Sequence, residues 1–99
     1  MTNAKKKTGS AKKQGEMKIV KFKFEANGVK KIMLAGDFNK WNYSATPLIK
    51  TGSLWQKDLS LKPGRYEYKF IVDGNWVTDP KNNNKSWNSF GTENSVLVI

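Results

Sequence analysis

The stretch from Gly64 to Trp76, GRYEYKFIVDGNW, carries the clearest structural pattern in this sequence of 99 residues. Large apolar side chains occupy every second position from Tyr66 to Val72, which predicts a β-strand with one buried face, and Lys69 falls on the opposite face. Asp73-Gly74 follows, and an Asp-Gly pair between two apolar runs is a strong signal for a two-residue hairpin turn. The stretch therefore predicts a β-hairpin that carries the indole of Trp76 just past its tip.

The rest of the chain from Met17 onward contains further short stretches with strand character. Apolar and charged residues alternate in residues 20–26, and a nearly continuous apolar run follows in residues 32–35. Asn27-Gly28 between them is a hairpin signal, so we expect these two strands to pair antiparallel with each other. Further strands are expected at residues 47–50, 54–61 and 94–99. About six or seven short strands, separated by turn formers and without a helical period, are typical of an all-β, immunoglobulin-like antiparallel β-sandwich.

Size and composition limit the classes to which the protein can belong. A chain of 99 residues permits one domain, and its hydrophobic share of 37% can fill the core of a small sandwich. It has no Cys and no His, so we expect no disulfide, no metal, no cofactor and no catalytic residue. No apolar run approaches the roughly 18 residues of a membrane helix, and the N-terminus lacks the apolar segment of a signal peptide. We therefore expect a cytoplasmic protein without a membrane partner.

The net charge of +10 is distributed unevenly along the chain. Residues 1–15 contain five Lys and no acidic residue, so half of the excess charge lies in this short segment. Its Lys, Gly, Ser, Thr, Ala and Gln cannot bury apolar surface, which predicts a disordered lysine-rich tail over residues 1–16 and a folded domain over residues 17–99. We interpret the tail as a solvated arm or linker; a tether for anions or nucleic acid is the alternative.

Two of the four tryptophans lie beside turns, where a large ring has few core partners. Trp41 follows the turn formers Asp37-Phe38-Asn39-Lys40, and Trp76 follows the Asp-Gly turn. The C–H face of a sugar ring lies flat on an aromatic ring, while its hydroxyl edge takes hydrogen bonds from side chains with fixed donors and acceptors. Exposed Trp41 and Trp76 therefore suit a carbohydrate site, and Lys69 and Asn94 are placed to supply polar groups at its rim.

The other candidate residues have structural alternatives. Trp55 lies in phase with Leu59 and Leu61 on one strand face, so we expect it in the core. Trp87 lies in the Asn-rich segment without clear apolar companions, and both ligand contact and surface packing stay open for it. Asn94 can instead hold a turn at the start of the last strand, and Asp73 is expected to be structural.

Four motifs occur in a characteristic order between Phe22 and Ile99: GDFNKW, YEYKFIVDGNW, DP and NSVLVI. In this order and spacing the sequence resembles the starch- and glycogen-binding module found in front of isoamylases and branching enzymes and in the β subunit of AMP-activated protein kinase. The resemblance implies a β-sandwich that binds glucan on two tryptophans, and these match Trp41 and Trp76. It also implies that Lys69 and Asn94 hydrogen-bond the sugar.

The loop before the last strand also matches this family. Phe90, Gly91 and Thr92 fall where the kinase subunit carries a leucine, glycine and threonine loop that supports the bound glucan. Phe90 departs from that leucine, and its aromatic ring can pack on a sugar at least as well. The resemblance thus adds Phe90 and Thr92 to the predicted site.

We therefore expect non-catalytic binding of α-1,4-glucan, such as glycogen, starch or malto-oligosaccharides. Glycoside hydrolysis needs two carboxylates that flank one bond, and the settings of the eight acidic residues do not suggest such a pair. One alternative is a protein-interaction module that targets an enzyme of glycogen metabolism, a role compatible with glucan binding. A basic single-stranded nucleic-acid binder is the weaker alternative, because the excess charge is concentrated in the tail and no aromatic series lies on one strand.

Overall fold

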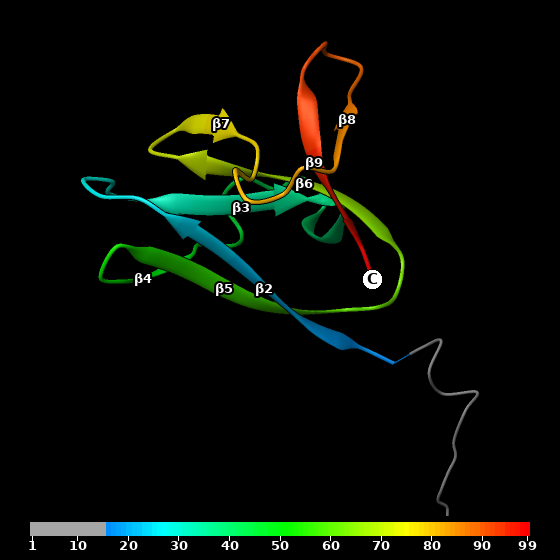
Figure 1. Cartoon of the computed structure of the whole chain (residues 1–99), viewed down its shortest axis with the longest axis horizontal. Coiled ribbons are helices and arrows are strands. Elements are labelled where there is room, and N and C mark those ends of the chain that lie inside the picture. The colour runs from blue at the N-terminus through cyan, green and yellow to red at the C-terminus, as the bar shows by residue number, and fades with distance from the viewer. Residues whose placement is uncertain (1–15) are drawn as a thin grey trace, which may run out of the picture.

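The computed structural model describes residues 16–99, which form a two-layered arrangement of strands (Figure 1). The strands are β2 (Lys18–Glu25), β3 (Ile32–Gly36), β4 (Ile49–Thr51), β5 (Leu54–Leu61), β6 (Arg65–Val72), β7 (Asn75–Val77), β8 (Lys85–Trp87) and β9 (Glu93–Val98), and one 3-10 helix, η2, spans Asp37–Asn39. No helix in this part of the chain is long and apolar enough to cross a membrane. The predicted disordered tail lies outside the described residues, apart from Glu16.

Two antiparallel sheets form the layers, which confirms the predicted all-β sandwich. One sheet has the order β2-β5-β4, and the other has the order β3-β6-β9-β8, with β7 also paired to β6. In Figure 1 the first sheet lies below the second, and the β8–β9 hairpin extends away from the rest of the second sheet.

Aromatic side chains from both sheets fill the core between the layers. Phe22 of β2 meets Tyr68 of β6 edge-on with ring centroids 5.1 Å apart, and Phe24 meets Phe70 in the same way at 5.1 Å. Such pairs add roughly 0.5–1.5 kcal/mol each beyond the burial of their area. Trp55 is buried in the same cluster, as its strand phase predicts.

The predicted pairing of the first two strands is wrong. Gly28 does adopt the left-handed φ of a turn (73°), but β2 pairs with β5 and β3 pairs with β6, so the turn carries the chain from one sheet to the other. The edge of β3 that faces away from β6 is occupied by residues 46–48: the Leu34 N–H donates to the carbonyl of Thr46, and the Leu48 N–H donates to that of Ile32, both at 2.9 Å. A turn signal predicts that the chain reverses locally, but it does not determine which strand will pair with the strand that follows the turn.

The Asp73 carboxylate fixes where that connection crosses. It accepts hydrogen bonds from the backbone N–H groups of Lys30, at 3.0 Å, and Lys31, at 2.9 Å. The tip of the β6–β7 hairpin thereby holds the chain as it enters β3. Asp73 is structural, as predicted.

Strand β6 is the central element for the outer face of the second sheet. One edge pairs with β3; on the other edge Arg65 to Tyr68 pair with β9, and Phe70 to Val72 pair with β7. The two neighbours therefore diverge at Lys69. Because Tyr68 and Phe70 point into the core, the alternating residues Glu67 and Lys69 point to the outer face.

The polar segment of residues 81–90 contains the short strand β8 and no helix, as its Asn and Ser content predicts. A buried hydrogen-bond chain fixes its start: the Tyr68 hydroxyl donates to Asp79 Oδ2 at 2.7 Å, and the Asp79 N–H donates to Ser95 Oγ at 2.8 Å. Asn82 donates to the Tyr68 hydroxyl and to the carbonyl of Val96. Burial raises the pKa of the Tyr68 phenol above its usual range.

Candidate functional site

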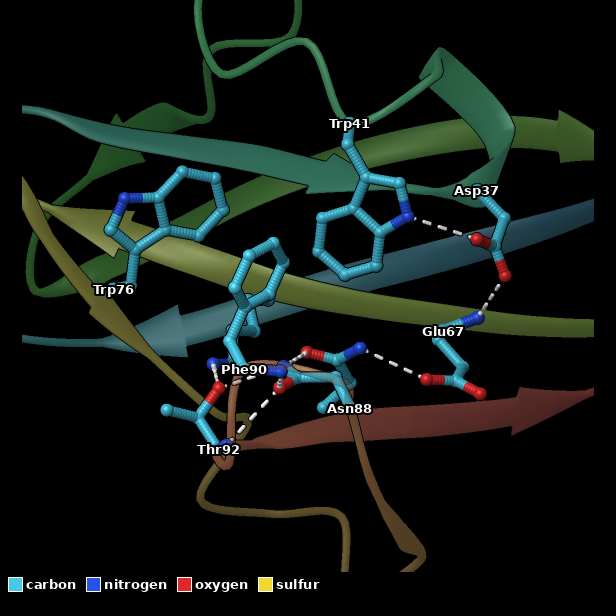
Figure 2. A pocket seen from close by; sticks show the side chains of 9 residues that line it. Asp37, Trp41, Glu67, Trp76, Asn88, Phe90 and Thr92 are labelled. Carbon is cyan, nitrogen blue, oxygen red and sulfur yellow. Dashed lines mark hydrogen bonds between the residues drawn. The ribbon is translucent and has the colours of Figure 1, made fainter.

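A partly open cavity of about 730 Å³ lies where β6, β7 and the β8–β9 loop meet. This volume falls within the range of small-molecule sites. All six residues predicted for the site line it: Trp41, Lys69, Trp76, Phe90, Thr92 and Asn94. Three lining residues were not predicted: Asp37, Glu67 and Asn88. In Figure 2 the rings of Trp41, Trp76 and Phe90 gather on one side, with Thr92 and Asn88 below them.

The position of Trp41 is set by its backbone conformation and by the packing of its ring. Its φ of 58° and that of Lys40, also 58°, lie in the left-handed region, which is unusual for a bulky residue and is concentrated at functional sites. The ring packs on the buried cluster of Met33, Ala35 and Ile71. The indole orientation is therefore fixed before any ligand binds.

Asp37 connects this ring to β6. Its Oδ1 accepts a hydrogen bond from Trp41 Nε1 at 2.9 Å, and its Oδ2 accepts one from the backbone N–H of Glu67 at 2.8 Å (Figure 2). Asp37 thus acts as a positioning residue for Trp41. In the sequence it is one of several Asp residues in turns, and only its contacts with Trp41 and Glu67 in the structure distinguish it.

Trp76 completes an aromatic surface with Trp41. It lies opposite Ile71 in the β6–β7 pair, so both side chains share the outer face. The indole is 46% exposed, its ring centroid lies 6.5 Å from that of Trp41, and the two planes are inclined by 33°. The two rings therefore form a slightly bent platform.

Lys69 and Asn94 lie deeper than the predicted rim position, because both are buried. Lys69 Nζ donates to Thr92 Oγ1 at 3.0 Å. Asn94 Nδ2 donates to Glu67 Oε1 at 2.9 Å, and its Oδ1 accepts from Asn88 Nδ2 at 3.1 Å. The lysine ammonium carries three donors, so donors beyond the one used on Thr92 remain for a ligand.

Asn88 organises the loop that carries Phe90 and Thr92. Its Oδ1 accepts hydrogen bonds from the backbone N–H groups of Phe90, at 2.9 Å, and Thr92, at 3.1 Å, while its Nδ2 donates to Thr92 Oγ1 at 2.7 Å. Gly91 supplies the left-handed φ of 80° between them. The loop presents the Phe90 ring almost fully exposed. The spacing from Asn88 to Thr92 is the only sequence signal for this role, and it is inconspicuous within an Asn-rich segment.

Trp87 stands apart from the cavity. It pairs with Glu93 across β8 and β9, whereas the next pair is Ser86 with Asn94, which lines the cavity. Neighbouring pairs on a sheet point to opposite faces, so the 70% exposed indole of Trp87 lies on the other face of the hairpin.

Two carboxylates, Asp37 and Glu67, share the cavity, which the sequence did not indicate. Both oxygens of each are engaged. Those of Asp37 bind Trp41 and the backbone of Glu67, while those of Glu67 accept from Asn94, at 2.9 Å, and Arg65 Nη1, at 2.8 Å. A general acid has to be protonated and to reach the ligand, so these carboxylates are arranged for positioning.

Several known proteins resemble this chain. Human 5'-AMP-activated protein kinase subunit beta-2 is 42% identical over 55 residues, which are 56% of this chain and 20% of the subunit. Protein PTST homolog 2, chloroplastic, of Arabidopsis thaliana is 36% identical over 73 residues, which are 74% of this chain and 13% of that protein. The chain therefore spans a fifth or less of the length of these two relatives.

A solved structure and a family model agree with these relatives. The crystal structure of a maltogenic amylase from S. marinus superposes with a TM-score of 0.73 at 32% identity, over 87% of this chain and 14% of the amylase. The model described as the glycogen recognition site of AMP-activated protein kinase matches residues 19–99, which is well over half of the chain and includes every residue of the cavity. The chain belongs to this family of glycogen recognition domains.

Proposed function

We propose that the cavity binds α-1,4-glucan, such as glycogen, starch or malto-oligosaccharides, without catalysis. The observation that carries this proposal is the pair of indoles 6.5 Å apart beside a polar floor, formed by the buried residues Lys69 and Asn94 and by Thr92 above them. Trp41 and Trp76 stack on the C–H faces of neighbouring glucosyl units, and the fixed orientation of Trp41 reduces the entropy lost on binding. Phe90 packs on the chain from the loop side.

The polar floor supplies hydrogen bonds to the sugar hydroxyls. Lys69 donates from its ammonium, and Asn94 and Thr92 contribute their amide and hydroxyl groups. Buried polar groups bind more strongly when their geometry is already set by neighbours, as the network of Glu67, Asn88 and Thr92 provides here.

Two alternatives make different demands on the cavity. A nucleic acid brings phosphates, yet Asp37 and Glu67 place two carboxylates beside the single cation Lys69 among the lining residues, which disfavours a polyanion. A protein-interaction role beside an enzyme of glycogen metabolism gains support from the relatives, which include a kinase subunit and an amylase. It is compatible with glucan binding, and we propose such a partner as a second role of the domain.

Residues 17–99 are proposed as the binding unit, in a cytoplasmic protein. The family model begins within β2, at residue 19, which supports this boundary. PTST homolog 2 carries the word chloroplastic in its name, so relatives of this chain are not confined to the cytoplasm.

A titration with maltoheptaose, followed by NMR of the ¹⁵N-labelled protein at two salt concentrations, tests the proposal. The indole signals of Trp41 and Trp76 should shift equally at both salts. Two stacks of about 1 kcal/mol each beyond area burial, set against the ordering of a flexible chain, give a Kd between micromolar and millimolar. A short single-stranded oligonucleotide serves as the control, and shifts produced by that ligand alone, and lost at high salt, would reject the glucan site.

A further inference from the structure

Tyr43 is an exposed aromatic residue next to the cavity, and it is not among the residues that line it. Its side chain is 66% exposed, and its ring centroid lies 6.4 Å from that of Trp76, with the planes at 73°. Trp76 is therefore in contact with two rings, Trp41 at 6.5 Å and Tyr43 at 6.4 Å.

The loop that carries Tyr43 is fixed by its own hydrogen bonds. Asn42 Oδ1 accepts from the backbone N–H of Ser44 at 3.0 Å and from its hydroxyl at 2.9 Å, and the Asn42 N–H donates to the carbonyl of Asn39 at 3.1 Å. Thr46, three residues after Tyr43, is buried, and its hydroxyl accepts a hydrogen bond from Asn39 Nδ2. The ordered turn fixes where the Tyr43 ring is presented, so the backbone that carries the ring loses little freedom on contact with a ligand.

The three rings do not share one plane. Trp41 and Trp76 are inclined by 33°, and Trp76 and Tyr43 by 73°. A flat, extended glucan would lie on coplanar rings, whereas the α-1,4 linkage turns each unit relative to the last and makes the chain curved. The rings of Tyr43 and Trp76 meet edge to face, so the Tyr43 ring is placed to contact a chain that curves away from the plane of Trp76.

We propose that Tyr43 is a third stacking surface, which takes a glucosyl unit beyond those held by Trp41 and Trp76 and so favours longer α-1,4-glucans. This inference rests on the proposed glucan binding. A short oligosaccharide satisfies the cavity itself, while a longer one continues past Trp76 onto the tyrosine ring. The gain in affinity with chain length is thus the property that depends on Tyr43.

Calorimetric titration of the whole chain with maltotriose and with maltoheptaose measures this gain as the ratio of the two Kd values. In Tyr43→Ala the advantage of maltoheptaose over maltotriose should shrink roughly threefold to tenfold, which is the effect of one aromatic stack. Tyr43→Phe keeps the ring and should keep the ratio. Trp87→Ala removes an equally exposed aromatic side chain from the far face of the β8–β9 hairpin and should also leave the ratio unchanged.

Each other outcome overturns the inference in a recognisable way. An unchanged ratio in Tyr43→Ala would mean that no sugar reaches the tyrosine. Equal weakening for both ligands would mean that Tyr43 only supports the orientation of Trp76. If the unmodified protein binds neither oligosaccharide, the proposed function fails and the inference fails with it, whereas normal binding with an unaffected ratio leaves the proposed function standing.

Discussion

Replacement of Trp76 by alanine tests whether this ring forms part of the binding platform. The indole is 46% exposed, which corresponds to roughly 100 Å² of free ring surface. If a glucosyl unit covers about half of that surface, burial contributes about 1.3 kcal/mol at 25 cal/mol per Å². The stacking geometry adds about 1 kcal/mol. Trp76→Ala should therefore weaken binding by roughly 2–3 kcal/mol, or about 30- to 150-fold in Kd.

The same substitution should leave the protein folded but less stable. Trp76 lies on the three-residue strand β7 and outside the buried clusters, but it pairs with the rings of Trp41 and Tyr43, so we expect a loss of about 1–3 kcal/mol in unfolding free energy. Calorimetric titration with maltoheptaose and thermal unfolding of the same sample give the two quantities. Trp87→Ala is the matched control. A Trp76→Ala variant that is folded and binds within threefold of the original would refute the assignment of this ring as a platform.

Three further substitutions test how the site is built. Trp41→Ala should abolish most binding and also lower the unfolding free energy by about 2 kcal/mol, or the melting temperature by about 10 °C, because this ring packs on Met33, Ala35 and Ile71; a variant as stable as the original would contradict that packing. Asn88→Ala should weaken maltoheptaose binding severalfold and speed hydrogen exchange at the amides of Phe90 and Thr92, which lose their acceptor, whereas Asn83→Ala in the same segment should change neither. The pKa of Tyr68 is raised in the folded state, so its phenol contributes stability that is complete below the ordinary tyrosine pKa of about 10 and is lost as the pH rises through the folded value. In Tyr68→Phe the unfolding free energy, measured by denaturant unfolding, should therefore fall less steeply above pH 10 than in the original protein.

The sequence predicts the local parts of this fold well. The alternation in β6 assigns Tyr68 and Phe70 to the core and Lys69 to the outer face, and Asp73-Gly74 forms the expected turn, with positive φ at both residues. These features depend on a few neighbouring residues, so their causes are present in the sequence itself.

The partners of distant segments could not be obtained in the same way. The wrong pairing of β2 with β3 followed from a genuine turn signal at Asn27-Gly28, because that signal contains no information about which strand fills an edge. The burial of Lys69 and Asn94 has a similar origin. Lys69 contacts Thr92, 23 positions away, and Asn94 contacts Glu67, 27 positions away. The depth of the cavity exists only once β9 and the β8–β9 loop are in place.

The arrangement of β6 explains why a sandwich this small can hold both a core and a site. Its inward residues anchor the two layers, and its outward residues, Glu67 and Lys69, line the cavity, so one strand serves both. The neighbours of β6 diverge at Lys69, which leaves space for the cavity on that edge, while β3 pairs with the opposite edge. The left-handed backbone at Lys40 and Trp41 lowers stability, and the hydrogen bond of Trp41 to Asp37 and its packing on β3 and β6 hold it in place. Stability is thus given up at the position that sets the direction of the Trp41 indole in the cavity.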